Sequence, residues 1–579
     1  MARPPAPSLD DDADGGALEA LARAIDLQQR GRLDDAEREY AALLARNARD
    51  VTVLINAGVL ALTRGDVPAS VERLSAATAL VPANAIAQGN LGFALIHANR
   101  LDDALRALER AVALKPDFAQ AHNSRGIALV RLKRRGEARE AFARALEILP
   151  AYVEAALNLG DLENQEGNAQ AARAAFQRVT ARDANHAIAN AGVAFADALD
   201  GRLNESIGAL YEVANRNRDK AAIWQTLAAV SNWAGRHEDA ERAYRHVLAL
   251  DDAHRDARFG VASTLLARGR YEEGLAAFER SRDAFVPASP WVRALPRWTG
   301  EILDGTLVLH GEQGLGDVVQ FVRFVPRLRE RVDRVVVWLD DYWKPLVPLL
   351  ATVQGVDEIV VDALAPPEPA KARASILSLA YIARATPESL WNGPYVTATP
   401  ERVASWRAHV DATARMRVGL AWAVHARDDF GLVTRHKSVP AAALAPLLEL
   451  DDIAFHSLQP GTDGDTAVFG TLASRIVPTG SMIADFGDTA ALVANLDLVI
   501  TPDTAVAHVA GALGKPVWLL ERFHGCWRWR LAQASCPWYP TLRIFRQARF
   551  DQWSDAVACV RSELALKASR PDSAAEHAP

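Results

Sequence analysis

Residues 92–125 read GFALIHANRLDDALRALERAVALKPDFAQAHNSR, and the first half of the chain returns to this pattern every 34 residues. One column consists of Gly31, Gly65, Asn99, Lys133, Gly167, Gly201, Gly235 and Gly269. Glycine and asparagine readily adopt the left-handed conformation of a turn, so seven of these eight positions, all but Lys133, favour a turn between helices. A second column is small: Ala24, Gly58, Gly92, Gly126, Gly160, Ala194, Ala228 and Ala262. A third is large and apolar: Tyr40, Leu74, Leu108, Phe142, Phe176, Leu210, Tyr244 and Phe278. Small residues let two helices approach closely, so these columns predict about eight stacked helix hairpins.

A helix–turn–helix period of 34 residues is typical of tetratricopeptide (TPR) repeats. We therefore predict an α-solenoid, a TPR superhelix over residues 17–285, after a disordered tail at residues 1–16. Such a superhelix has a concave face suited to extended peptides.

One polar column lies two residues before the small position on the first helix of four repeats: Asn56, Asn90, Ser124 and Asn158. An asparagine amide offers both a donor and an acceptor, so a ladder of amides can hold a peptide backbone whatever its sequence. Local hydrogen bonding within the repeats explains the column equally well. The sequence therefore offers an acceptor-peptide groove and a purely structural ladder as two open interpretations.

Composition excludes several classes of protein. The 579 residues have a formal net charge of -7 and a pI near 6.1, which argues against bulk nucleic-acid binding. Three cysteines, all in the last tenth of the chain, predict a reducing compartment. The N-terminal MARPPAPSLDDDADGG lacks the apolar stretch of a secretory signal, and no apolar run reaches the ~18 residues of a membrane span. We expect a cytoplasmic protein without a membrane span.

The second half has a different character. Twelve of the fourteen tryptophans lie between Trp291 and Trp553, and β-branched runs begin to alternate with helical segments. This alternation predicts parallel sheets covered by helices. We place a linker at residues 286–300, two Rossmann-like α/β lobes at 301–405 and 406–567, and a second disordered tail at 568–579. Two such lobes in tandem create a cleft at the carboxyl ends of their strands.

Three segments of the second half are candidates for chemistry. The first, GEQGLGD at residues 311–317, joins a strand to a helix. Its glycines, Gly314 and Gly316 among them, permit close approach of a ligand, and Asp317 faces either the cleft or its own helix as a cap. No Gly-Lys-Ser/Thr follows, so this is not a P-loop.

The second segment, TPDTAVAH at residues 501–508, follows an apolar strand and opens a helix whose N–H groups can bind a pyrophosphate. Asp503 and Thr504 are equally good capping residues, and His508 is either a ligand-binding residue or a core histidine. The third segment, RHKS at residues 435–438, contributes Lys437, a cation that could neutralise a departing diphosphate or simply belong to a solvated basic loop. No Cys/His cluster has recognisable metal-ligand spacing, so no metal is expected.

GEQGLGD (311–317), DTAVAHVAGALGKPVW (503–518) and PWYPTLRIFRQ (537–547), together with the repeats, resemble the bacterial TPR-containing glycosyltransferases. The catalytic half of that family is similar to the lipopolysaccharide heptosyltransferases, and its layout resembles O-GlcNAc transferase and the flagellin glycosyltransferases. The resemblance implies a GT-B fold and metal-independent sugar transfer, with a nucleotide-sugar as substrate and no cofactor.

The resemblance also implies roles for single residues. Asp317 matches the catalytic base, Asp503, Thr504 and His508 match the donor-binding turn, and Lys437 lies near the cation that meets the donor phosphate. Trp527 and Arg528, with residues 537–540, would shape the nucleotide side of the cleft. The chain departs from the pattern after Trp422, where Val424-His425 replaces a glycine that lets backbone approach the ligand.

Three functions follow from this reading. The first is transfer of a sugar to a Ser or Thr hydroxyl of a protein recruited by the TPR region, with flagellin or another surface protein as a target by analogy. The second is heptosyltransferase-like transfer to lipopolysaccharide or another glycan. The third is a non-catalytic TPR interaction scaffold with a degenerate GT-B region, which the missing glycine favours.

Overall fold

The computed structural model describes residues 15–282, 287, 289–365, 370–391, 393–411, 413–424, 437–461, 466–523, 525–529, 535–550 and 552–569. Residues 1–14 and 570–579 of the two predicted tails lie outside these ranges, as do His425, Arg435 and His436. Two compact units make up the chain, residues 1–197 and residues 198–579. Among the described helices, none combines the length and the hydropathy needed to cross a bilayer.

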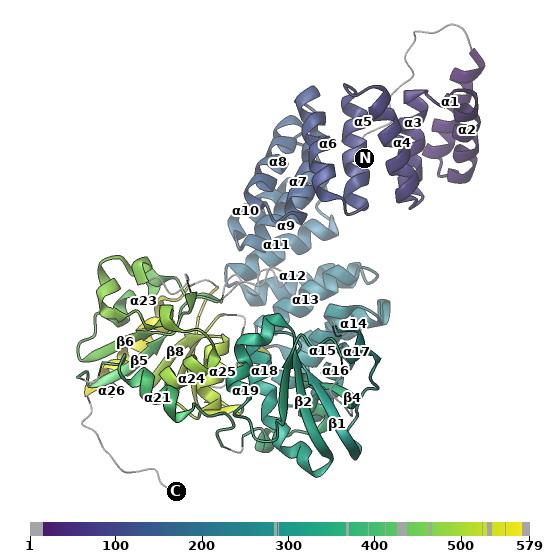
Figure 1. The fold of residues 1–579 in the computed structure, drawn as a ribbon. Helices are drawn as coiled ribbons and strands as arrows, with labels where there is room; N and C mark the ends of the chain where they lie inside the picture. The colour runs from purple at the N-terminus through teal and green to yellow at the C-terminus, as the bar shows by residue number, and fades with distance from the viewer. Residues whose placement is uncertain are drawn as a thin grey trace. The chain divides into compact units, whose positions relative to one another are not determined.

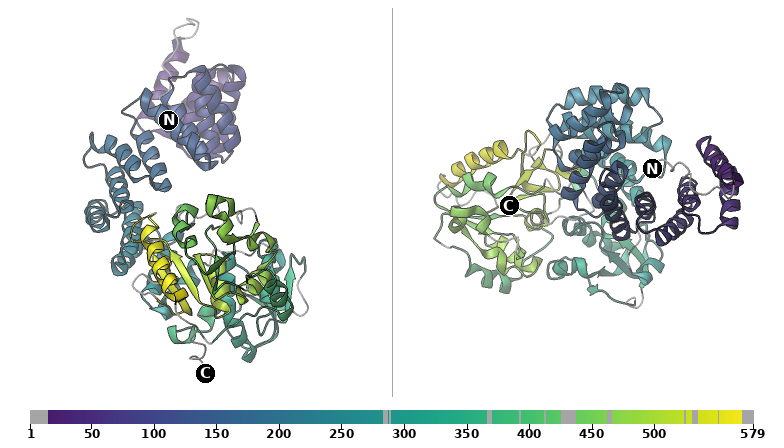
Figure 2. Two further views of the ribbon diagram at one scale, coloured as in Figure 1. Left: turned by 90° about the vertical axis from the view of Figure 1, so that its left-hand side faces the viewer. Right: turned by 90° about the horizontal axis from the view of Figure 1, so that it is seen from above.

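The first half is a solenoid of antiparallel helix pairs, drawn from purple through blue to teal in Figure 1 and seen from two other sides in Figure 2. Its helices are α1 Gly15–Gln29, α2 Leu33–Arg46, α3 Val51–Thr63, α4 Val67–Leu80, α5 Ala85–His97, α6 Leu101–Leu114, α7 Ala119–Arg131, α8 Arg135–Ile148, α9 Val153–Glu166, α10 Ala169–Thr180, α11 Ala187–Leu199, α12 Leu203–Arg216, α13 Ala221–Trp233, α14 His237–Leu250, α15 Arg255–Ala267 and α16 Tyr271–Ser281. All eight residues of the predicted turn column have positive φ, from 56° at Asn99 to 86° at Gly201. Lys133, the exception to the sequence pattern, adopts the same conformation with φ 63°.

The small and large columns pack against each other inside each repeat. A Cβ added at Gly58, Gly92, Gly126 or Gly160 would collide with the large residue 16 positions later, which is Leu74, Leu108, Phe142 or Phe176 in turn. The contact recurs in these four repeats. Glycine therefore allows the two helices of a repeat to lie closer together than a larger residue would. The sequence prediction of a TPR solenoid is confirmed.

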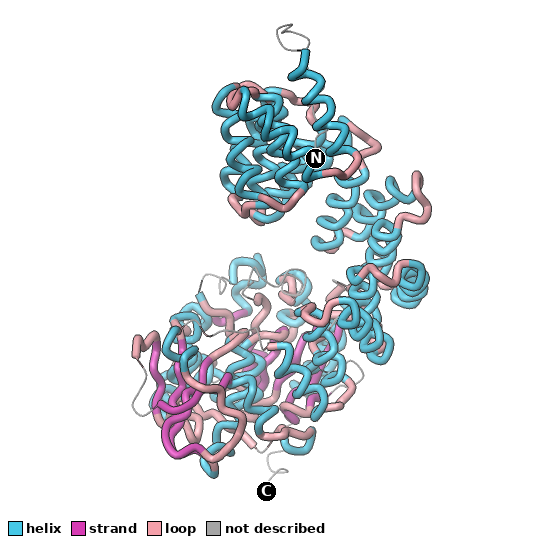
Figure 3. Tube along the Cα trace, turned by 90° about the vertical axis from the view of Figure 1, so that its right-hand side faces the viewer, coloured by secondary structure: helices cyan, strands magenta, loops and turns pink. Residues whose placement is uncertain are grey.

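Strands occur only in the second unit among the described residues, as the magenta segments of Figure 3 show. The strands are β1 Leu303–His310, β2 Val332–Leu339, β3 Glu358–Val361, β4 Ala370–Ser375, β5 Met416–Leu420, β6 Ile453–Ser457, β7 Ile476–Val477, β8 Leu498–Pro502, β9 Val517–Glu521, β10 Ser535–Cys536 and β11 Tyr539–Arg546. The helices among them are α17 Pro290–Ala294, α18 Leu315–Phe321, α19 Val347–Leu350, α20 Leu379–Ile382, α21 Pro400–Arg407, α23 Ala441–Leu448, α24 Phe486–Ala494, α25 Ala505–Ala512 and α26 Ser554–Ser569. The 3-10 helices are η1 Val322–Glu330, η2 Asp341–Leu346, η3 Ile376–Ser378, η4 Pro387–Ser389, η7 Thr466–Arg475, η8 Thr479–Met482 and η9 Trp527–Trp529.

The strands form two sheets with the order of doubly wound folds. The first runs β3-β2-β1-β4 and is wholly parallel; the second runs β10-β11-β9-β8-β5-β6-β7 and is parallel except for β10. The last five residues of β1 and all of β5, apart from the partly buried Arg417, are buried, as expected of strands covered on both faces. The predicted α/β region with two parallel sheets is confirmed.

The helix that the sequence predicts after the glycine-rich loop is short. The α-helix α18 ends at Phe321 and continues as the 3-10 helix η1, which contains Pro326. Proline lacks the N–H that an α-helical bond requires, so the helix cannot run through this position. The tighter η1 still buries Phe324 and Leu328.

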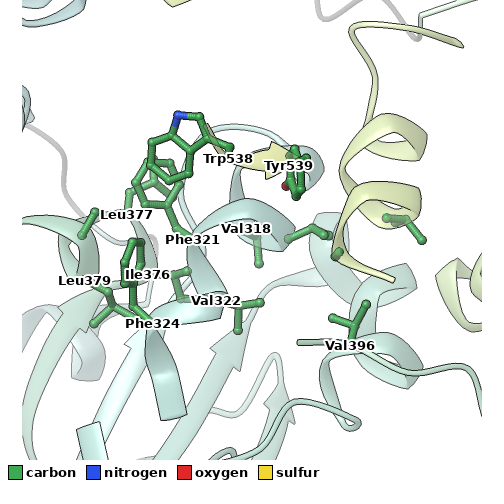
Figure 4. Packing of buried hydrophobic residues seen from close by; sticks show 14 of the residues in the cluster. Val318, Phe321, Val322, Phe324, Ile376, Leu377, Leu379, Val396, Trp538 and Tyr539 are labelled. Carbon is green, nitrogen blue, oxygen red and sulfur yellow. The ribbon is translucent and has the colours of Figure 1, made fainter. Parts of the chain in front are cut away.

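The last repeat belongs to the core of the second unit. Tyr271 and Phe278 of α16 share a buried cluster with α18 and with Trp527 and Trp538. The Phe278 ring lies 6.4 Å from the Phe321 ring and 6.1 Å from that of Trp527, centroid to centroid. Figure 4 shows Trp538 over Phe321, with ring centroids 5.6 Å apart.

A buried ion-pair network ties the same repeat to the loop that carries Asp317. Arg282 donates to Glu312 at 2.8 Å, to Glu279 at 3.0 Å and to the Ser378 hydroxyl at 2.9 Å. Arg282 and Glu312 are both buried. The change from helices to strands falls between Ser281 and Leu303, whereas the compact units divide inside α11, between Asp197 and Ala198. The last repeats are therefore a structural part of the α/β unit.

Replacing Phe278 by Ala should destabilise the second unit by about 3–5 kcal/mol, because the truncation leaves a cavity between α16, α18 and η9. All fourteen tryptophans lie between Trp224 and Trp553, so tryptophan fluorescence reports on this unit alone. The matched control is Phe176→Ala, at the same repeat position in the first unit and equally buried. It should lower the helical melting transition seen by circular dichroism while leaving the fluorescence transition in place. Equal fluorescence shifts for both variants would contradict the assignment of the last repeat to the second unit.

Candidate functional site

The sheet order brings the three predicted segments to the carboxyl ends of parallel strands. The glycine-rich loop follows β1, which pairs with β2 on one side and β4 on the other. Lys437 lies in the connection that follows β5, and Asp503 follows β8, which pairs directly with β5. In open α/β sheets ligands bind where the strand order reverses, at the carboxyl edge. Both β1 and the β5–β8 pair occupy such switch points.

Asp317 is held from two sides. The N-cap of α18 is Gly314 and not Asp317; as the third residue of the helix, Asp317 accepts a hydrogen bond on Oδ2 from the Gly314 N–H at 2.9 Å. Its Oδ1 accepts a charge-assisted bond from Nη2 of Arg528. Arg528 also donates to Gln320 of the same helix, and its guanidinium lies 4.5 Å from the Trp527 ring centroid. The side chain of Asp317 keeps 20% exposure, which leaves it reachable.

Gly316 lets α18 come against α25. A Cβ at Gly316 would lie 2.6 Å from Cδ2 of His508 and 3.4 Å from the Cα of Ala505, the first residue of α25. The buried His508 ring bonds the Tyr539 hydroxyl through Nδ1 at 3.0 Å. Burial lowers the pKa of His508 to about 4, although Asp503 and Asp317 oppose the shift. His508 is therefore a neutral, packed imidazole at the junction of the two segments.

Lys437 and Asp503 form an ion pair with Nζ and Oδ2 2.7 Å apart. Burial by itself would raise the pKa of Asp503, but the nearby Lys437, His508 and Arg522 hold it well below its usual value. Thr504 is the N-cap of α25, yet its side chain makes no capping bond and instead meets the Thr501 hydroxyl at 3.0 Å. The sequence analysis treated Lys437 and Asp503 as separate site residues. The structure pairs them beside the first turn of α25.

The backbone after β5 is already occupied. The N–H of Ala423 donates to Oε1 of Gln459 at 3.0 Å, and that of Val424 donates to the Ser438 hydroxyl at 2.9 Å. The family resemblance predicts glycine at the second of these positions, where the chain has Val424. The N–H groups of Ala423 and Val424 are therefore engaged within the fold.

The polar column of the solenoid is mostly buried. Asn56 is fully buried, and its amide nitrogen and oxygen have no partner among the described residues. Asn90 and Ser124 are also buried, and the partly buried Asn158 donates to Oδ1 of Asn123 at 2.9 Å. The amide contact between repeats therefore uses Asn123, one residue before Ser124. A role of this column in peptide binding stays a prediction.

Two charged residues at the end of β9 were not singled out by sequence reasoning. Glu521 is fully buried; its Oε1 accepts from the Cys526 N–H at 3.1 Å, and Oε2 has no partner among the described residues. Burial raises the pKa of Glu521 to about 7, with Asp503 adding to the shift and Arg522 opposing it. Arg522 follows directly and is also buried. The sequence could have indicated them, because two charged residues directly follow the apolar run of this strand, at its carboxyl end.

The repeats and one short segment of the α/β region match known families. The tetratricopeptide repeat model matches residues 21–85, 55–117, 90–153, 125–187 and 234–290. The model of glycosyltransferase family 9 (heptosyltransferase) matches residues 484–522, which include the Asp503–His508 turn. The chain thus contains tetratricopeptide repeats, and a short segment of its C-terminal region is similar to glycosyltransferase family 9.

Among curated proteins, the chain is similar to protein FlbA of Caulobacter vibrioides, with 28% identity over 333 residues, 53% of this chain and 54% of FlbA. The chain thus spans about half the length of this relative. Among solved structures it is similar to MamA, with 24% identity, 28% of this chain, 94% of MamA and a TM-score of 0.26. A tetratricopeptide repeat protein from Parabacteroides merdae matches with 17% identity, 43% of this chain, 98% of that chain and a TM-score of 0.37. The fold assignment rests on the repeat matches and the strand order.

Gly316→Ala should destabilise the second unit by about 1–3 kcal/mol, because the added methyl group meets His508 in a packed contact. Gly208→Ala on the exposed face of α12 is the matched control, since a Cβ there meets nothing within 4 Å. That change should stabilise the unit by about 0.5–1 kcal/mol through helix propensity. Chemical denaturation followed by tryptophan fluorescence measures both, and equal stability of the two variants would contradict the close approach.

Glu521→Gln should stabilise the protein increasingly as pH rises. The carboxyl has its usual pKa of 4.5 when unfolded and about 7 when folded, so below pH 4.5 both states are neutral and above pH 7 folding must bury the anion. The free energy of unfolding of Glu521→Gln should therefore rise relative to that of the wild type between pH 5 and pH 8, by about 3 kcal/mol in total. Melting curves at four pH values measure it, with the exposed Glu330→Gln as the control. A pH-independent difference would contradict burial of an ionisable Glu521.

Proposed function

We propose that this protein is a nucleotide-sugar-dependent glycosyltransferase of the GT-B type that needs no metal. The observation that supports this most is the meeting of α18 and α25 at Gly316. It places Asp317 and Arg528 next to His508 and the first turn of α25, with Lys437 and Asp503 on the neighbouring strand ends. Among the described residues, no group of three His, Cys, Asp or Glu side chains could hold a metal ion.

The residues present divide the reaction into two halves. Asp317 accepts the proton of the acceptor hydroxyl as its oxygen attacks the anomeric carbon. The bond from that carbon to the phosphate oxygen breaks, and the nucleotide leaves with the bonding electrons. Lys437 and the N–H groups that open α25 stabilise the negative charge of the leaving phosphate. Arg528 fixes the Asp317 carboxylate toward the acceptor side.

The proposed acceptor is a Ser or Thr hydroxyl of a protein. A long TPR array supports this, because such arrays bind extended peptides and a small sugar acceptor needs none. The last repeat supports it further, since Arg282 joins the array to the loop of Asp317 through Glu312. A surface protein such as flagellin is the target that the family resemblance suggests.

Asp317→Asn should reduce sugar transfer by about 10²–10⁴-fold, because it removes the general base, while nucleotide affinity changes little. Asparagine keeps an oxygen that can accept from Gly314 or Arg528, so the loop should stay folded. Asp304→Asn, at a fully exposed position of the same lobe, is the matched control. The measurement is incorporation of labelled sugar into acceptor protein, with a melting curve for each variant. Unchanged transfer by Asp317→Asn would contradict the assigned base.

Two other functions give different results in the same assay. Label in isolated glycan instead of protein would favour the heptosyltransferase-like alternative. Failure of the intact protein to bind any nucleotide or nucleotide-sugar would favour a non-catalytic scaffold. The scaffold alternative is supported by one observation: the backbone N–H groups of Ala423 and Val424 are hydrogen-bonded within the protein.

A further inference from the structure

A chain of hydrogen bonds runs from a buried arginine to the histidine of the candidate site. Nη2 of Arg323 donates to the Tyr395 hydroxyl at 2.9 Å. That hydroxyl lies 3.2 Å from the Tyr539 hydroxyl, which in turn lies 3.0 Å from Nδ1 of His508. Arg323, Tyr539 and His508 are buried, so the chain is shielded from bulk water along most of its length.

The guanidinium gives this chain a direction. Arginine has donors only, so the Tyr395 oxygen must be the acceptor of the bond from Arg323. Burial raises the pKa of Tyr395 and of Tyr539, so both hydroxyls keep their protons at neutral pH. Among the described residues, the Tyr395 proton has the Tyr539 oxygen as its acceptor. Tyr539 then donates its own proton to Nδ1 of His508.

The opposite direction would leave one proton without an acceptor. If Nδ1 of His508 carried the proton and donated it to Tyr539, the Tyr539 hydroxyl would have to donate to Tyr395. The Tyr395 oxygen already accepts from Arg323, and its own proton would then have no acceptor among the described residues. Bonds in a chain polarise one another and an unmade bond is costly, so the direction set by Arg323 is favoured.

This direction decides which ring nitrogen of His508 carries the proton. Burial lowers the pKa of His508 to about 4, so the ring is neutral and has one protonated nitrogen. Because Nδ1 accepts from Tyr539, the proton is on Nε2. Nε2 lies against α18, since a Cβ added at Gly316, the residue before Asp317, would be 3.3 Å away. In this tautomer Nε2 is a donor and has no lone pair with which to take up a proton.

We propose that Tyr539 is a positioning residue of the candidate site, which together with Arg323 and Tyr395 holds His508 in the tautomer protonated at Nε2. His508 is then a hydrogen-bond donor beside α18 and cannot act there as a general base. This inference rests on the proposed function in one respect, that an acceptor hydroxyl loses its proton at this site. It leaves Asp317, and not the neighbouring histidine, to accept that proton.

The test records the ring-nitrogen NMR signals of the intact, ¹⁵N-histidine-labelled protein at neutral pH, and His508→Gln serves only to identify the signals of His508. In the wild type, Nε2 should carry the proton, and Nδ1 should show the shift of an unprotonated, hydrogen-bonded nitrogen. Tyr539→Phe removes one oxygen and should move the Nδ1 signal to that of an unprotonated nitrogen without a hydrogen bond. Tyr381→Phe, at an exposed tyrosine of α20, is the matched control and should give the wild-type spectrum.

Two spectroscopic results would overturn the proposal. A proton on Nδ1 of wild-type His508 would mean that the chain of bonds runs in the other direction. An unchanged Nδ1 signal in Tyr539→Phe would mean that Tyr539 is not the donor. The wild-type spectrum decides the tautomer by itself, so the proposal remains testable even if melting curves show that Tyr539→Phe does not fold.

A kinetic readout tests the positioning role. Tyr539→Phe should lower the rate of sugar transfer about fivefold, the equivalent of one lost hydrogen bond, with little change in the KM of the acceptor. A rate equal to that of the wild type would overturn the positioning role. The spectra need neither donor nor acceptor, so failure of the wild type to transfer sugar would overturn the proposed function while the tautomer is still decided by NMR.

Discussion

The close approach of α18 to α25 at Gly316 is the constraint on which the candidate site depends. Any side chain at this position would occupy the space of His508, so the two helices could not bring their first turns together. With glycine there, Arg528 reaches Asp317 although 211 residues separate them in sequence. His508 then serves as a neutral spacer, anchored to Tyr539, between the carboxylate of one lobe and the helix start of the other. Glycine at position 316 thus allows residues from three distant segments to lie together.

A similar principle shapes the solenoid. In four consecutive repeats a glycine on the first helix lies against a large residue of the second, and the turn between helices is left-handed at every one of the eight column positions. The last repeat uses its large residue, Phe278, differently: the ring packs on Phe321 and Trp527 instead of on another repeat. The last helix of the repeat array therefore contributes apolar side chains to the core of the α/β unit. The compact unit that contains this contact begins at residue 198, well before the first strand.

The edge formed by β5, β8 and β9 carries buried charged residues whose polar atoms lack partners among the described residues. Within the part of the chain that the structure describes, one carboxylate oxygen of the buried Glu521 and two nitrogens of the buried Arg522 have no hydrogen-bond partner. Cores ordinarily satisfy such groups, and departures from that rule concentrate at sites where stability is exchanged for binding. The ion pair of Lys437 with Asp503 lies in the same place. The charge pattern therefore agrees with the topology, which independently puts ligand binding at this edge.

The sequence by itself determined the periodic parts of this protein. The 34-residue columns predicted the helix hairpins and their turns, and the alternation of β-branched runs with helical segments predicted the parallel sheets, because the spacing of side chains along the chain is a local signal. Only the tertiary structure decided which strand ends are neighbours. The pairing of Asp317 with Arg528, the burial of Glu521 and Arg522, and the merger of the last repeat with the α/β unit all depend on sheet order and helix approach. These are long-range contacts, and no local period encodes them.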